Sequence, residues 1–117
     1  MTNLNQSNSF TQLPIIKLGL IKGRHPLPVD KYILEEEVQQ YTKDELLPLV
    51  IQGLNNLGIT DHASTNKQPI DLYLTGLTIV SLVAVELLTA WGYSVDVYGF
   101  NPNTKEYYKQ GTFTPRV

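Results

Sequence analysis

Cationic side chains crowd into one short segment of the sequence. Lys22, Arg24 and His25 follow an apolar run, with Gly23 between the first two. An arginine guanidinium can grip a phosphate through two parallel hydrogen bonds, and a histidine titrates near neutrality and can move protons. The segment therefore predicts an anion-contacting loop, in which Arg24 and His25 are the catalytic candidates. The alternative interpretation is a solvated turn with ordinary charges.

A second segment with binding chemistry is the sequence Thr-Gly-Leu-Thr at 75–78. Gly76 lets the backbone turn sharply, and the hydroxyl of Thr75 or Thr78 can accept a hydrogen bond from the first turn of a helix as its N-cap. Together with the helix dipole, these groups can hold an anionic oxygen. We therefore predict a set of ligand-binding residues drawn from both segments: Lys22, Gly23, Arg24, Thr75, Gly76, Leu77 and Thr78.

Two strands must position these segments. The apolar runs 15–21 and 70–74 are rich in residues that favour strands, and each ends where one of the two segments begins. The run 79–90 predicts a helix almost without a polar face, which Gly92 ends. Helical crossovers are right-handed and make the strands that they join parallel. Both segments are therefore expected at the same edge of one sheet.

The remaining chain supplies two more helices and a hairpin. We predict a helix from Asp30 to Gln40 with Glu35–Glu37 on a solvated side, and a second helix that starts at a Thr42–Glu45 capping box and ends at Gly58. Strands at 94–100 and 105–110 flank a turn. The resulting order is β-α-α-β-α-β-β, an α/β fold: a small Rossmann-like three-layer domain with a mostly parallel sheet and a C-terminal antiparallel hairpin. Residues 1–13 are expected to be a disordered tail, and 14–117 a single domain.

Composition narrows the function classes. The chain has 117 residues, a formal net charge of −2 and no cysteine, which argues against a broad nucleic-acid surface and against thiolate chemistry. No secretory signal and no apolar run long enough to cross a bilayer is visible, so we expect a cytoplasmic protein without a membrane partner. The sequence lacks a phosphate-binding loop and a dinucleotide fingerprint. No cofactor and no metal are therefore expected.

Phosphate recognition could extend to catalysis without a metal. In RNA the attacking 2′-hydroxyl belongs to the substrate, so a protein needs only to hold that oxygen in line and stabilise the charged transition state. Arg24 and Lys22 can stabilise the charge, and His25 can act as general acid or base.

The order of a strand, Thr75-Gly76-Leu77-Thr78, a buried helix, a glycine, a strand, a turn and a Tyr-Tyr strand resembles the small CRISPR-associated Rossmann-like proteins classed as ring nucleases, relatives of the CARF sensor domains. It also looks like small proteins of phages and mobile elements. The resemblance covers residues 70–110 best, and the 15–34 segment more loosely. It implies homodimers that bind, and often cut, cyclic oligoadenylate messengers of antiviral defence.

Three functions remain open from the sequence. The first is a ring nuclease, a metal-independent enzyme that opens a cyclic oligonucleotide. The second is a sponge that sequesters the ring uncut, as an anti-defence protein would. The third is a protein–protein module in which the apolar helix 79–90 forms an oligomer interface. Trp91, Tyr107 and Tyr108 are expected to pack within the fold rather than stack on a base.

Overall fold

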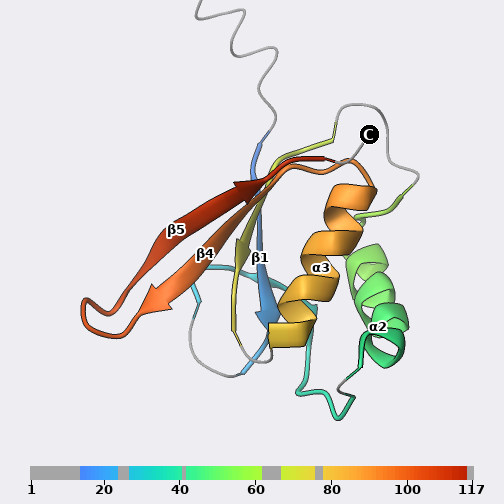
Figure 1. The fold of residues 1–117 in the computed structure, drawn as a ribbon, viewed down its shortest axis with the longest axis horizontal. Helices are drawn as coiled ribbons and strands as arrows, with labels where there is room; N and C mark the ends of the chain where they lie inside the picture. The colour runs from blue at the N-terminus through green and yellow to red at the C-terminus, as the bar shows by residue number, and fades with distance from the viewer. Residues whose placement is uncertain (1–13, 24–26, 41, 62–66, 76–77, 116–117) are drawn as a thin grey trace, which may run out of the picture.

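A computed structural model describes residues 14–23, 27–40, 42–61, 67–75 and 78–115. Within these ranges the chain forms five strands and two helices in one α/β fold (Figure 1). The bounds are β1 Ile16–Ile21, β2 Lys31–Leu34, α2 Lys43–Asn56, β3 Ile70–Tyr73, α3 Thr78–Ala90, β4 Val95–Asn101 and β5 Glu106–Phe113. Residues 1–13, where the sequence predicts a disordered tail, lie outside the described part.

The strands form one mixed sheet in the order β2-β1-β3-β4-β5. The first four strands are parallel, with Leu18 of β1 beside Leu72 of β3 and Leu72 beside Val97 of β4. The last pair, β4 and β5, is antiparallel and forms a long hairpin that projects beyond the rest of the sheet (Figure 1). The predicted mostly parallel sheet with a C-terminal antiparallel hairpin is therefore confirmed.

The helix predicted from Asp30 to Gln40 is wrong. Residues 31–34 instead form β2, which pairs in parallel with β1, and Ile33 and Leu34 are buried. The three glutamates that follow favour a helix, but a Tyr-Ile-Leu run beside the open edge of β1 gains both ladder hydrogen bonds and burial, and these tertiary contacts outweigh the local preference. The order in the described residues is therefore β-β-α-β-α-β-β.

The predicted three-layer arrangement is also wrong for the described residues, because α2 and α3 lie on the same face of the sheet and pack against each other (Figure 1). The steps from β2 to β3 and from β3 to β4 run in the same direction across the sheet, so right-handed crossovers put both helices on one side. The approach of α2 to β2 is close enough that a side chain at Gly53 would overlap the carbonyl of Ile33. We call the opposite side of the sheet the far face.

The helix boundaries follow local signals. Thr42 and Glu45 form the predicted capping box at the start of α2. Pro48 lies inside α2, which is one element from Lys43 to Asn56. Gly58 and Gly92 have positive φ angles of 82° and 95°, and each follows a helix end with the paired backbone bonds of a Schellman motif. The predicted helix-ending roles of these two glycines are confirmed.

One continuous apolar core lies between the sheet and the two helices. Its largest fully buried members come from every element except β2 and β5: Leu18, Leu20, Ile21, Leu46, Leu54, Ile70, Leu72, Leu88, Val50, Val80, Val83 and Val95. α3 is covered on most sides, but Leu82 is 60% exposed on its outer side. No helix in the described part of the chain is long and apolar enough to cross a membrane.

Candidate functional site

The carboxyl ends of β1 and β3 lie side by side at one edge of the sheet. The two strands are parallel neighbours, in register from Ile16 beside Ile70 to Gly19 beside Tyr73. Just past the last ladder pair, the hydroxyl of Thr75 donates a hydrogen bond to the carbonyl of Ile21 over 3.3 Å. The segments that begin at Lys22 and at Thr75 therefore leave the sheet together, as the sequence predicts.

The order in which strands are added to the sheet reverses between β1 and β3. After β1 the chain adds β2 on one side of it, and β3, β4 and β5 are then added on the other side. The two connections also leave toward opposite faces. A Cβ atom on Gly19 would lie 2.7 Å from the side chains of Leu27 and Tyr32, so the β1–β2 connection crosses the far face, whereas α3 leaves β3 on the helix face. Open α/β sheets bind ligands in the crevice outside such a switch point.

We call the edge of the sheet at the carboxyl ends of β1 and β3 the rim. Lys22 and Gly23 form the first part of this rim. Gly23 has a positive φ of 94°, a backbone conformation that glycine adopts without strain. The ammonium of Lys22 lies 3.6 Å from the carboxylate of Glu35, with both side chains more than half exposed. A pair this exposed contributes little to stability and leaves Lys22 free to exchange partners. Arg24 and His25, the catalytic candidates, lie outside the described residues.

Thr75 and Thr78 have different environments. Thr75 is 6% exposed, and its hydroxyl proton bonds Ile21, so this side chain joins the two strand ends rather than facing solvent. Thr78 is exposed and is the first residue of α3, whose first turn contains no acidic side chain. The positive end of the α3 dipole is therefore not neutralised from within the helix. Gly76 and Leu77 lie outside the described residues.

Acidic residues reach this edge too, which the sequence interpretation missed. Glu35, Glu36 and Glu37 follow β2 and lie beyond its carboxyl end, not on the outer side of a helix. Because β2 is parallel to β1, these side chains share the edge with Lys22, and Glu35 is close enough to pair with it. Their charge opposes an incoming anion. The signal that could have revealed this position is the Tyr-Ile-Leu run before them.

The far face carries a row of charged and aromatic residues. Lys17, Asp71 and Asp96 lie in register on adjacent strands, and Asp96 accepts a hydrogen bond from Thr112 and pairs with Lys109. Burial raises the pKa of Asp71, and the nearby Asp96 carboxylate raises it further. Each of these aspartates stands between two apolar residues of its strand. Because neighbouring side chains of a strand point to opposite faces, the aspartates lie on the far face while the apolar neighbours face the core.

Aromatic residues lie in the next rows of this face. Tyr73 stacks on Tyr98 with ring centroids 4.7 Å apart, and Tyr107 meets Tyr73 edge-on at 5.5 Å. Burial raises the pKa of the Tyr73 and Tyr107 hydroxyls. Tyr107 therefore packs within the fold, and Trp91 packs half-buried against the core. Tyr108 is 47% exposed and accepts a hydrogen bond from Gln110.

The described residues contain no group of three or more histidine, cysteine or acidic side chains placed to hold a metal ion. No protein-family model matches the sequence, and no curated protein or solved structure is significantly similar to it. The geometry of the chain itself is therefore the basis for a functional proposal.

Proposed function

We propose that the chain binds a cyclic oligonucleotide messenger at the β1/β3 switch point and opens it without a metal. The observation that carries this proposal is the hydrogen bond between Thr75 and Ile21, because it joins the ends of the two strands between which the sheet reverses direction. We also propose that the fold is related to Rossmann-like domains and that the protein is cytoplasmic, as expected from the sequence. Support comes from a positive helix end, an exposed lysine and a glycine turn at one rim.

Each group at this rim has an assigned part in phosphate binding. The ammonium of Lys22 breaks its ion pair with Glu35 and contacts a phosphate oxygen. Thr78 and the first free N–H groups of α3 hold another oxygen. Arg24 grips the phosphate that reacts. Together these groups stabilise the negative charge that develops on the phosphate in the transition state.

The reaction needs no external nucleophile. The 2′-oxygen of the ring bonds to the adjacent phosphorus while the bond from phosphorus to the 5′-oxygen breaks, which gives a linear product with a 2′,3′-cyclic phosphate. His25 takes the proton from the 2′-hydroxyl or delivers one to the leaving 5′-oxygen. This ring-opening reaction consumes no metal, water or cofactor, because the ring itself supplies both the nucleophile and the leaving group.

Two copies of the chain would match a two-fold symmetric ring. Leu82 and Phe113 are 60% and 48% exposed and border a groove of about 300 Å³ between α3 and the hairpin. The other apolar residues that line this groove are Leu74, Val85 and Val97. We assign this apolar surface to a homodimer interface, because the exposed leucine of one copy has a complementary apolar groove on the other.

A non-catalytic sponge is the second candidate. The observation that favours it is that the described residues of this rim include no histidine, so the cleavage reaction depends on His25 alone. Binding requires only the lysine, the arginine and the helix end. The same ligand would then be held without bond cleavage.

Incubation of the chain with cyclic di-, tri-, tetra- and hexanucleotides, followed by chromatography, separates the three functions. Linear products support the ring nuclease, and a retained but intact ring supports the sponge. Retention of no ring contradicts both and leaves the protein–protein module. Arg24→Ala and Lys22→Gln should weaken ring binding while the circular dichroism spectrum stays unchanged, and unchanged affinity in both variants would refute the site. His25→Ala should abolish cleavage but retain binding.

A further inference from the structure

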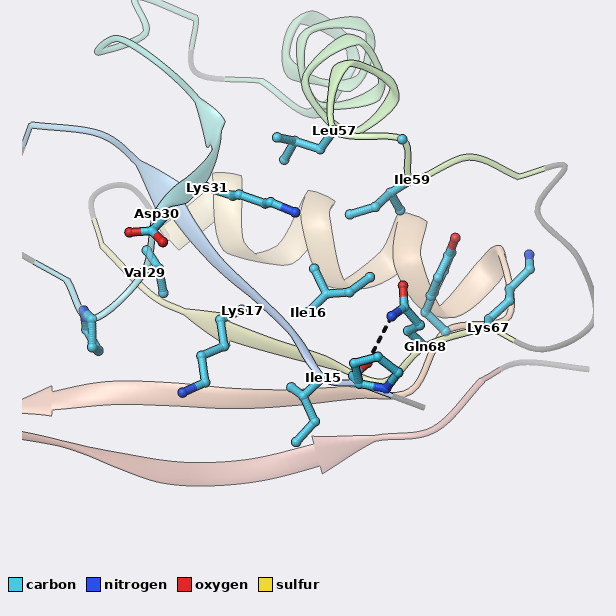
Figure 2. Close-up of a pocket in the computed structure, with 14 residues that line it drawn as sticks. Ile15, Ile16, Lys17, Val29, Asp30, Lys31, Leu57, Ile59, Lys67 and Gln68 are labelled. Carbon is cyan, nitrogen blue, oxygen red and sulfur yellow. Dashed lines mark hydrogen bonds between the residues drawn. The ribbon is translucent and has the colours of Figure 1, made fainter. Parts of the chain in front are cut away.

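A second cavity lies at the opposite edge of the sheet, near the amino ends of β1 and β2 and the last turn of α2 (Figure 2). Its volume is about 630 Å³, within the range of pockets that bind small molecules. The six residues of β1 place it roughly 20 Å from the switch point, at about 3.3 Å per residue. None of the described residues that line it belongs to the site proposed above.

Apolar side chains form the walls of this cavity. Figure 2 shows Ile16, Leu57 and Ile59 around its centre, supplied by β1, the end of α2 and the segment after it. Ile59 is held in place by the Schellman motif, since its N–H bonds the carbonyl of Leu54 at 3.0 Å. These walls offer an apolar surface to the body of a ligand.

One ammonium group points into the apolar part of the cavity. Lys31 is the first residue of β2 and is in register with Leu18, so its side chain emerges on the helix face. In Figure 2 its ammonium extends between Leu57, Ile59 and Ile16. It has no hydrogen bond or ion pair with any residue in the described part of the chain. This group is therefore available to an anion.

The remaining charges around the cavity leave it positive. Lys67 is fixed at one side by bonds to the carbonyls of Trp91 and Asp61, with its ammonium 5.0 Å from the centre of the Tyr93 ring. Among the described residues that line the cavity, the acidic one is Asp30, and its carboxylate points away from the ammonium of Lys31 (Figure 2). The field in the cavity therefore favours a negative group near Lys31.

We propose that this cavity binds an amphipathic organic anion, a carboxylate with an apolar chain. The carboxylate pairs with Lys31, and the chain lies against Ile16, Leu57 and Ile59. A ligand with several phosphates fits less well, because Lys17, another cation of the lining, extends its ammonium away from that of Lys31 (Figure 2). This proposal does not depend on the one made for the switch point.

Octanoate is the probe for the test, with octanol and octylamine as ligands of equal chain length but different charge. Titration into the isotopically labelled full chain, followed by nuclear magnetic resonance, should shift the backbone amide signals of Lys31, Ile59 and Gln68 saturably. Octanoate should bind at least several-fold more tightly than octanol, and added salt should weaken only the octanoate complex. Equal affinity for octanoate and octanol, or no saturable shift, would overturn the proposal.

Lys31→Gln should lower octanoate affinity roughly tenfold, the loss expected for a hydrogen bond to a charged group, while octanol affinity stays unchanged. Because Lys31 is exposed, the variant should melt at the wild-type temperature. Lys22→Gln is the matched control at the other edge of the sheet. It should bind octanoate normally and lose affinity for the cyclic oligonucleotide, and Lys31→Gln should do the reverse. Unchanged octanoate affinity in Lys31→Gln would reject the site.

Discussion

The hydroxyl of Thr75 donates a hydrogen bond to the carbonyl of Ile21, a residue 54 positions earlier in the chain, at a distance of 3.3 Å. This bond joins the ends of β1 and β3 where the chain turns away from the sheet in both strands. Thr75→Val keeps the size of the side chain but removes the donor. We expect a loss of about 1 kcal/mol in the free energy of unfolding, measured by urea denaturation.

Thr78→Val is the control for this substitution, because Thr78 is exposed and begins α3 instead of joining two strand ends. Its change in the free energy of unfolding should stay within about 0.5 kcal/mol. Equal losses in the two variants would show that the bond between Thr75 and Ile21 does not stabilise this edge.

Glu35 should oppose ligand binding at the switch point. Its carboxylate lies 3.6 Å from the ammonium of Lys22, so it competes with any phosphate for that cation. Glu35→Gln should therefore raise the affinity for a cyclic oligonucleotide by a factor of about two to five, the equivalent of roughly 0.4–1 kcal/mol for an exposed pair. Isothermal titration at low salt measures this change. A fall in affinity would mean that Lys22 needs Glu35 to hold its position.

Gly53 should tolerate no side chain. A Cβ atom at this position would overlap the carbonyl oxygen of Ile33, where α2 lies on β2. Alanine favours helices over glycine by about 1 kcal/mol, but overpacking against backbone costs about 1–3 kcal/mol, so Gly53→Ala should destabilise the chain. Thermal unfolding measures the effect. Gly111→Ala is the control, since nothing lies within 4 Å of a Cβ atom there, and a similar loss in both variants would contradict the close approach.

Asp71 should make stability depend on pH. Burial and the nearby Asp96 carboxylate raise the pKa of Asp71 above its ordinary 3.8, although Lys17 and Lys109 oppose the rise. The folded chain then holds this proton more tightly than the unfolded chain. The carboxylate therefore destabilises the fold at neutral pH, and this effect disappears as the pH falls through the raised pKa toward 3.8.

Asp71→Asn should accordingly be more stable than the wild type at neutral pH, with a difference that shrinks as the solution is acidified. Urea denaturation at a series of pH values measures both curves. Asp96→Asn should have the opposite effect at neutral pH, because it weakens the 2.6 Å hydrogen bond from Thr112 and the ion pair with Lys109. A destabilised Asp71→Asn variant would show that its neighbouring lysines outweigh burial.

Leu82 should control the oligomeric state. Its side chain is 60% exposed beside the apolar groove between α3 and the hairpin. Leu82→Asp should convert a dimer to a monomer, because the interface would bury an unpaired charge. Sedimentation velocity measures the change, with Ile15→Asp as a control at a similarly exposed apolar residue that does not line the groove. A monomeric wild-type chain would refute this interface.

The sequence by itself determined the parts of the fold that depend on near neighbours. The capping box of Thr42 and Glu45, the helix ends at Gly58 and Gly92, and the turn of the hairpin each involve residues only a few positions apart. Such hydrogen bonds form whatever surrounds them. The sequence also predicted that the turns after β1 and β3 share one edge, because crossover connections make the strands that they join parallel.

The tertiary structure decided what depends on distant partners. Residues 31–34 became a strand because the edge of β1 was free to pair with them, and this pairing carried Glu35 to the edge where Lys22 lies. The order of the strands, which no local signal contains, put both helices on one face. It also brought Lys31 beside the last turn of α2, since contacts between elements far apart in sequence are fixed only when the whole sheet assembles.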